Sequence, residues 1–252
     1  MATLPDSFSR LSELSKLCLS GNNLSMLPDS FGKLGSLQEL NLAENRLAML
    51  PNSFGKLRSL RELDLSHNEL TMLSESFCQL RNLQKLALYS NKLTTLPESF
   101  GNITALQNDL ILNNNGLKTL PDSFNQLKSL QGLYLHTNKF EVFPEIITKL
   151  ENLEYLDIMD NILEELPISI LNMKSLKKIC INLNPFSNDL DLYYDWEEYK
   201  DGDFKYLCEH LRERRKKEFI EESKKIDKYT REIEGGFLLD LRIKRDDKQE
   251  IE

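Results

Sequence analysis

The chain has 252 residues, which is enough for one good-sized hydrophobic core or two small ones. Its hydrophobic fraction of 40% and charged fraction of 29% are typical of a globular protein, and its formal net charge of -8 argues against a general binder of nucleic acid or of an anionic membrane. The longest apolar runs are only a few residues, so the sequence predicts no membrane-spanning helix.

The N-terminal segment MATLPDSFSR has neither a basic n-region nor an apolar h-region, so we predict no signal peptide. The four cysteines lie far apart, at Cys18, Cys78, Cys180 and Cys208. This spacing argues against a disulfide framework and favours a reducing compartment. We therefore expect a cytoplasmic protein.

The chain begins in the middle of a repeating unit. Residues 4–8 read Leu-Pro-Asp-Ser-Phe, a segment that recurs later between predicted strands, and here no strand precedes it. We expect this half-repeat, residues 1–13, either to cap the core alone or to belong to a longer array.

Eight copies of the frame LxxLxLxxNxL follow. The asparagine recurs every 23 residues, with one step of 24, at Asn22, Asn45, Asn68, Asn91, Asn115, Asn138, Asn161 and Asn184. The alternating LxL segment predicts a short strand whose leucines point inward. Each asparagine ends a strand, and we expect its amide to hydrogen-bond turn backbone that would otherwise be buried and unpaired. Repeated in every turn, these bonds would form a ladder.

The one longer step lies in the fifth repeat, where residues 106–110 contain one residue more than the frame, so we expect a bulge just before that strand. Between the frames, a Leu-Pro pair predicts an extended return on the convex side, because proline fixes φ and keeps its predecessor out of the α region. Aromatic and aliphatic side chains recur in register at Phe8, Phe31, Phe54, Phe77, Phe100, Phe124, Ile147 and Ile170. Since no repeat can bury its apolar side alone, neighbouring repeats must stack into one continuous core.

This pattern resembles intracellular leucine-rich-repeat proteins with 23-residue LPxSFxxLxxLxxLxLxxNxL units, similar to Ras-group-related and Ras-scaffold leucine-rich-repeat proteins, over about residues 4–186. The resemblance implies an α/β repeat solenoid, a horseshoe with a parallel concave β-sheet of about eight strands and a helical C-terminal cap or tail. It also implies a protein–protein interaction scaffold or adaptor whose partner is a small GTPase or another signalling protein. The repeat scaffold serves many functions, so it does not name the partner.

The leucine frame is absent from residue 188 onward, where 15 Lys and Arg stand against 20 Asp and Glu. We divide the chain into a solenoid at 1–187, an acidic, aromatic cap and charged helix at 188–234, and a short possible strand with a disordered tail at 235–252. The charged helix is either a solvated extension of the cap or a second interaction element in which Phe219, Ile226 and Ile233 dock a partner helix or a second copy. The basic run at 212–217 has glutamates within helical reach, which favours a salt-bridged helix face over a nuclear-localisation signal.

The sequence lacks the common motifs of nucleotide-binding, hydrolase and metal sites. The sequence contains no GxxxxGK[ST], GxGxxG or GxSxG motif, and none of its three histidines lies at metal-ligand spacing from another histidine or a cysteine. Cys18 and Cys180 occupy an exposed strand position, but neither strand has a histidine to activate a thiol, so a cysteine-dependent enzyme is disfavoured. We expect no enzymatic activity, no cofactor and no metal.

The positions that the frame leaves free predict the binding surface. In LxxLxLxxN the third, fifth and seventh side chains face the concave side, and the eighth lies at its rim. These positions form an acidic patch (Glu39, Glu44, Glu62 and Asp64) and an aromatic patch (Tyr89, Ile111, Tyr134, His136, Tyr155 and Met159). The scaffold does not require tyrosine or methionine there, whereas interfaces favour both.

We therefore predict that a monomeric chain binds a protein through the aromatic patch, while the acidic patch selects a basic partner segment. The alternative is a structural module or a fragment of a larger protein, with aromatic residues scattered on the sheet by chance. Exposure of Leu4 and Phe8 would favour the fragment.

Overall fold

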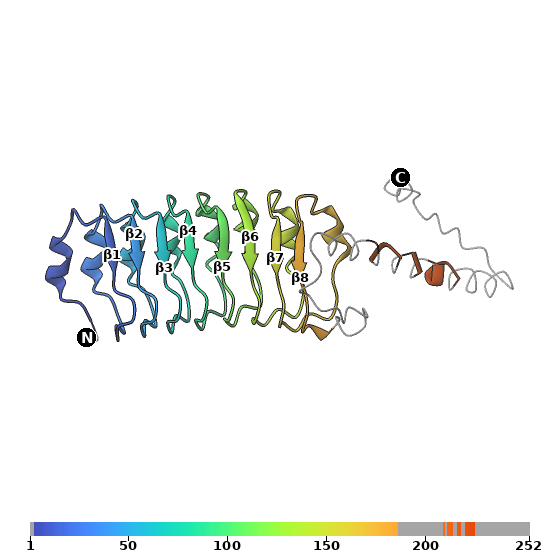
Figure 1. The fold of residues 1–252 in the computed structure, drawn as a ribbon, viewed down its shortest axis with the longest axis horizontal. Coiled ribbons are helices and arrows are strands. Elements are labelled where there is room, and N and C mark those ends of the chain that lie inside the picture. The colour runs from blue at the N-terminus through green and yellow to red at the C-terminus, as the bar shows by residue number, and fades with distance from the viewer. Residues whose placement is uncertain (1–2, 186–208, 210, 214–215, 218–219, 225–252) are drawn as a thin grey trace, which may run out of the picture. The chain divides into compact units, whose positions relative to one another are not determined.

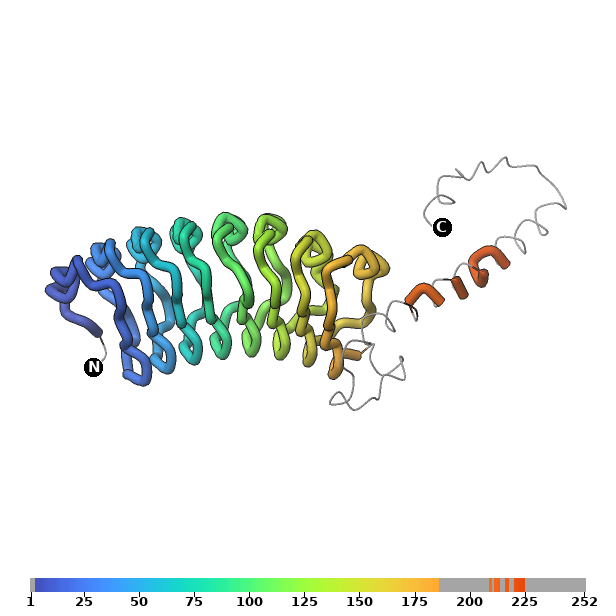
Figure 2. The backbone as a smooth tube through the Cα atoms, turned by 45° about the horizontal axis from the view of Figure 1, so that its top comes forward, coloured from blue at the N-terminus to red at the C-terminus, as the bar shows by residue number. Residues whose placement is uncertain are grey.

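The computed structural model describes residues 3–185, 209, 211–213, 216–217 and 220–224. The chain divides into two units, Met1–Phe204 and Lys205–Glu252, which we describe separately. The described residues of the first unit form a series of similar coils, one for each repeat (Figure 2), and each coil contains one short strand and one 3-10 helix.

The strands form one parallel sheet, and each pairs with its neighbours in the sequence (Figure 1). They are β1 (Lys16–Cys18), β2 (Glu39–Asn41), β3 (Glu62–Asp64), β4 (Lys85–Ala87), β5 (Asn108–Ile111), β6 (Leu130–Tyr134), β7 (Tyr155–Asp157) and β8 (Lys178–Cys180). The register advances by one repeat at each step, so that Leu17 lies beside Leu40 and Leu40 beside Leu63. The predicted eight-stranded parallel sheet is confirmed.

The core lies behind the sheet and is continuous from repeat to repeat. The inward leucine of each strand is buried, as at Leu40 and Leu63. Behind these leucines the rings of Phe31 and Phe54 stack with centroids 6.1 Å apart, and Phe54 and Phe77 follow at 6.2 Å. The predicted column continues through buried Phe100, Phe124, Ile147 and Ile170.

The return between strands differs in part from the prediction. Pro28 is extended, as expected, with φ -68° and ψ 153°, but a 3-10 helix follows at once because the Phe31 N–H donates to the Pro28 carbonyl at 2.9 Å. The helices are η1 (Asp6–Arg10), η2 (Asp29–Lys33), η3 (Asn52–Lys56), η4 (Glu75–Gln79), η5 (Phe100–Asn102), η6 (Asp122–Gln126), η7 (Glu145–Lys149) and η8 (Ile168–Asn172). The longest of these have five residues, too few for a periodic sequence signal.

Three glycines allow adjacent 3-10 helices to pack closely. A Cβ atom built on Gly32, Gly55 or Gly101 would lie 2.2, 2.0 or 1.8 Å from a serine carbonyl oxygen of the next helix. Only a residue without a side chain fits at such a separation. In η4 the equivalent position is the buried Cys78.

The predicted asparagine ladder is confirmed. Asn45 Nδ2 donates to the Leu19 carbonyl of the preceding repeat at 2.9 Å and also to two carbonyls of its own turn, while its Oδ1 accepts from the Leu24 N–H at 2.9 Å. The same pattern recurs through Asn184. The side chain therefore ties each turn to the one before it.

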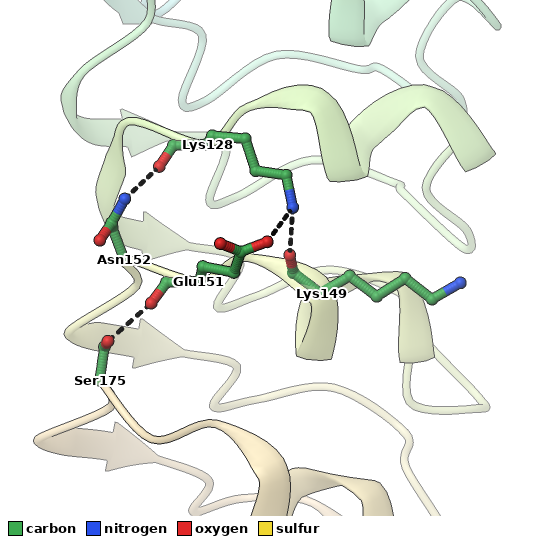
Figure 3. A network of polar contacts seen from close by, with 5 residues as sticks. All are labelled: Lys128, Lys149, Glu151, Asn152 and Ser175. Atoms are coloured by element: carbon green, nitrogen blue, oxygen red, sulfur yellow. Dashed lines mark hydrogen bonds and ion pairs between the residues drawn. The ribbon is translucent and has the colours of Figure 1, made fainter.

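A second set of contacts between repeats involves residues that lie just before strands β6, β7 and β8 in the sequence (Figure 3). Lys128 Nζ contacts Glu151 Oε1 at 2.7 Å and the Lys149 carbonyl at 3.1 Å, Asn152 Nδ2 donates to the Lys128 carbonyl at 2.8 Å, and Ser175 Oγ donates to the Glu151 carbonyl at 2.6 Å. These contacts link repeats six, seven and eight along one flank.

The insertion in the fifth repeat forms the expected bulge. The register between β5 and β6 shifts between Asn108 and Asp109, and Asn108 has a positive φ of 59°. The bulge falls on the first residues of β5, whereas the prediction places it just before the strand. Asparagine tolerates the left-handed backbone that the extra residue requires.

At the first repeat the predicted half-repeat packs onto the core. Leu4 is buried and Phe8 is half-buried, while Leu11 is 50% exposed.

In the second unit the described residues are helical. Lys216 pairs with Glu213 at 2.7 Å and Lys224 with Glu221 at 3.3 Å, each three residues apart, as expected for a salt-bridged helix face. The acidic, aromatic cap, the stripe at Phe219, Ile226 and Ile233, and the possible strand near the C-terminus lie outside the described residues.

Candidate partner-binding surface

The third, fifth and seventh side chains of each frame lie on the outer side of the sheet, which we call the sheet face. All ten predicted binding residues retain some solvent exposure. Glu44 is exposed, and the other nine are half-buried. Glu44 also has a positive φ of 54°, a conformation shared by the eighth residue of every repeat, such as His67 and Asp160.

The acidic patch is partly neutralised. Lys16 Nζ lies 2.6 Å from Glu39 Oε1, and Lys85 Nζ lies 2.7 Å from Glu62 Oε1. The predicted patch does not include these lysines, although the third position of the frame places them in the same column as the glutamates. Asp64 forms hydrogen bonds within its own turn: its Oδ1 accepts from the Ser66 N–H at 2.9 Å and from the Ser66 hydroxyl at 2.6 Å.

An open groove of about 880 Å³ crosses the sheet face from β1 to β5. Its charged lining contains both signs, with Lys16, Glu39, Glu62, Asp64, Lys85 and Asp109. Exposed ion pairs of this kind contribute little to stability, so their side chains remain available to rearrange. The groove therefore offers mixed charge, because three residues of the acidic patch, Glu39, Glu62 and Asp64, lie in it beside two lysines.

The aromatic patch separates into two groups. Tyr89 contacts His67 edge-to-face at 4.9 Å between ring centroids. Tyr134 and Tyr155 lie together on β6 and β7, with centroids 5.0 Å apart and planes tilted by 41°. His67, at the eighth position of the frame, is a contact that the predicted aromatic patch does not contain.

Tyr155 is the most heavily contacted of these residues. Its hydroxyl lies 3.4 Å from Cys180 Sγ, and Lys178 Nζ lies 5.6 Å from its ring centroid. Burial raises the pKa of the Tyr155 phenol well above its usual value, and the neighbouring Cys180 and Asp157 act in the same direction. Burial also raises the pKa of Tyr134, with the negative charge of Asp109 as a further cause. Both phenols therefore stay protonated at neutral pH.

Asp157 belongs to this group, although the predicted patch omits it. It is only 8% exposed, and its Oδ1 accepts from the Met159 N–H at 3.1 Å. Burial raises the pKa of its carboxyl group, while the Met159 N–H bond and the charges of His136 and Lys178 oppose that shift. The fifth position of the frame, where Asn41 and Asp64 also stand, is the sequence signal that locates it.

The two cysteines considered as nucleophiles have hydroxyl neighbours. Cys18 Sγ lies 3.3 Å from Ser20 Oγ, and this contact lowers the pKa of the exposed thiol. Cys180 is buried against the Tyr155 hydroxyl. Neither hydroxyl is a general base near neutral pH. Among the residues that the structure describes, no group of three or more His, Cys, Asp or Glu side chains is arranged to hold a metal ion.

Within the described ranges, no helix is long and apolar enough to cross a membrane.

The family model described as "Leucine rich repeat" matches residues 3–47, 48–93 and 58–108. A leucine-rich-repeat protein of Leptospira interrogans is 32% identical, with a TM-score of 0.61, and the match covers 73% of this chain and 52% of that one. An internalin of Listeria monocytogenes is 22% identical, with a TM-score of 0.64 and coverages of 72% and 52%.

A third similar structure is the leucine-rich-repeat ectodomain of the plant membrane receptor kinase GASSHO1/SCHENGEN3 from Arabidopsis thaliana, in complex with CASPARIAN STRIP INTEGRITY FACTOR 2. It is 34% identical, with a TM-score of 0.64, and the match covers 72% of this chain and 23% of that one. The matched region spans about half the length of the two bacterial proteins. The comparison with curated proteins finds no significant match. The repeated frame, the eight-stranded parallel sheet and these similarities identify the chain as a leucine-rich-repeat protein.

Proposed function

We propose that the chain is a protein–protein interaction scaffold that holds a protein partner on the sheet face, centred on Tyr134 and Tyr155. The observation that carries the proposal is the pairing of two half-buried aromatic rings, 5.0 Å apart, at positions where the repeat requires no apolar side chain. Aromatic residues of this kind provide a large contact area at little entropic cost. The plant receptor ectodomain, which shares the repeat fold, has been determined in complex with CASPARIAN STRIP INTEGRITY FACTOR 2.

The finer proposal is a cytoplasmic, monomeric, non-enzymatic adaptor whose partner is a small GTPase or another signalling protein. It is supported by the resemblance of the repeat unit to intracellular leucine-rich-repeat proteins. The fold leaves the identity of the partner open, because repeat scaffolds of this type serve many functions.

The test is affinity capture from native lysate with the wild-type chain and the triple variant Tyr89→Ala/Tyr134→Ala/Tyr155→Ala. Circular dichroism first establishes that both are folded. The matched control replaces three exposed side chains of the return segments, Met26→Ala/Met49→Ala/Met72→Ala, which are 56%, 63% and 59% exposed.

We expect a partner that the wild type and the methionine variant capture and the tyrosine variant loses. Reconstitution with the purified partner should then show the same ranking of affinities. Identical capture by all three chains would contradict the assignment of the sheet face and direct attention to the charged C-terminal unit.

A further inference from the structure

The scaffold uses the side chain of Asp157 but does not need its charge. The Asp157 Oδ1 accepts the N–H of the residue two positions later, Met159, where the strand ends. Asn41 makes the same bond to the Ala43 N–H at 2.9 Å with a neutral amide. An uncharged side chain therefore suffices for this cap, so the cap does not account for the negative charge at Asp157, which is 8% exposed.

The surroundings of Asp157 suit a cation. Tyr134 lies beside Asp157 in sheet register, Tyr155 lies two residues before it on β7, and an aromatic ring attracts a positive charge over its face. Gly132 precedes Tyr155 in the same column, and the Asp109 carboxylate fills the space beside it, since a Cβ atom on Gly132 would lie 2.0 Å from Asp109 Oδ1. Two aromatic rings and the carboxylates of Asp109 and Asp157 thus lie together on this part of the sheet face.

The chain already places one of its own cations here. Lys178 Nζ lies 5.6 Å from the centroid of the Tyr155 ring, and the Lys178 charge acts on Asp157. The Lys178 side chain is exposed and rises from the adjacent strand β8. An exposed lysine can rotate away at little cost, so it marks the preferred position of an ammonium group without closing it.

The acidic patch on β2 and β3 is a weaker candidate for the same task. Its carboxylates Glu39 and Glu62 form ion pairs with Lys16 and Lys85, at 2.6 and 2.7 Å. A partner cation would compete there for exposed pairs in water, where each pair is worth little. At Asp157 the carboxylate is desolvated, and a charge–charge interaction is stronger in such surroundings.

We propose that the sheet face at β6–β8 takes up a single lysine or arginine side chain of the protein partner, which displaces Lys178, lies against the rings of Tyr134 and Tyr155 and is attracted by the Asp157 carboxylate. This inference rests on the proposed function and adds the chemistry of the partner residue. It also predicts that Lys178 competes with the partner.

The probes are three small compounds that differ only in the side chain: the N-acetyl methylamides of lysine, arginine and norleucine. Each is titrated into the full chain carrying isotope-labelled tyrosine rings, and NMR follows the ring signals, which are assigned with Tyr134→Phe and Tyr155→Phe. We expect saturable shifts of the Tyr134 and Tyr155 signals with the lysine or the arginine compound and none with norleucine. The compound whose shifts saturate at the lower concentration shows whether the site prefers an ammonium or a guanidinium group.

Three variants make the result specific. Asp157→Asn keeps the cap and should weaken binding of the cationic probe about tenfold or more, since it removes the close charge. Asp122→Asn is the matched control, because it makes the same exchange on the exposed helix η6, away from the sheet face, and it should bind as the wild type does. Lys178→Met should bind about threefold more tightly, since it removes the competing cation. Equal shifts with norleucine and the cations, or wild-type binding by Asp157→Asn, would overturn the inference.

The two proposals fail in different ways. If the triple tyrosine variant keeps its captured partner, the proposed function fails. If that variant loses the partner while Asp157→Asn holds it with wild-type affinity, the function stands and only the cation-binding role of Asp157 is refuted.

Discussion

Replacing one ladder asparagine tests how the stack of repeats is held together. Asn68 Nδ2 donates to the carbonyls of Leu42, Leu65 and Ser66 at 2.9, 3.1 and 3.2 Å, and its Oδ1 accepts from the Leu47 N–H at 2.9 Å. In Asn68→Ala the leucine carbonyls still accept from the asparagines of the adjacent repeats. The Leu47 N–H instead loses the amide oxygen that it donates to.

The expected loss of stability in Asn68→Ala follows from the number of hydrogen bonds that the substitution removes. A buried donor left without a partner costs about 1–3 kcal/mol, and each of the remaining lost bonds adds a smaller net amount. We expect Asn68→Ala to lower the free energy of unfolding by about 2–4 kcal/mol. The exposed Asn22 is the control, since its amide donates to carbonyls of its own turn, Leu19 and Ser20, and Asn22→Ala should cost less than about 1 kcal/mol.

The assay is urea unfolding followed by circular dichroism. Repeat proteins can unfold in parts. The slope of the unfolding free energy against urea concentration must therefore be the same in all variants before their stabilities can be compared. If Asn68→Ala and Asn22→Ala agree within about 0.5 kcal/mol, the ladder does not carry the stability that its hydrogen bonds suggest.

Three further predictions concern the packing and the charged groups. In Gly55→Ala the new methyl group would lie 2.0 Å from the Ser76 carbonyl oxygen, so the melting temperature should fall by about 4–10 °C. Gly35 has room beside it, so Gly35→Ala should leave the melting temperature unchanged. Equal effects of the two substitutions would refute the close packing at Gly55. Burial raises the pKa of Tyr155 above its unfolded value near 10, so stability should fall as pH rises above about 10, and Tyr155→Phe should lessen that fall; parallel alkaline unfolding curves would disprove it. Burial also raises the pKa of Asp157, so its carboxylate costs stability above its unfolded pKa near 3.9. Asp157→Asn should therefore raise the free energy of unfolding at pH 7 more than at pH 3, whereas a loss at pH 7 would contradict the neutral cap.

The fold could be predicted because two columns of side chains repeat in register. The asparagine column and the phenylalanine column each mark one side of every coil, and their common period determines which strands are neighbours. The 3-10 helices could not be predicted in the same way, since five residues contain no periodic signal. They arise from a local hydrogen bond, as between Phe31 and Pro28, that leaves no characteristic sequence pattern.

The candidate site was predictable in its positions and less so in its electrostatics. The frame places Tyr134 and Tyr155 on adjacent strands, and the structure brings their rings into contact. The frame also places Lys16 beside Glu39, but only the structure shows the ion pair. The frame places Asp157 at the fifth position, but its burial to 8% exposure cannot be read from the sequence, since Asp64 at the same position is half-buried.

The glycines on the helical side also govern the curvature of the solenoid. The stacked phenylalanine rings are 6.0–6.2 Å apart, whereas adjacent strands in a sheet are separated by about 4.8 Å, so each repeat is a thin wedge whose narrow edge is the sheet. Gly32, Gly55 and Gly101 keep the wide edge narrow by letting the helices touch. A bulkier residue there would open the wedge and bend the sheet more sharply. The curvature of the sheet face thus depends on residues on the opposite side of each coil.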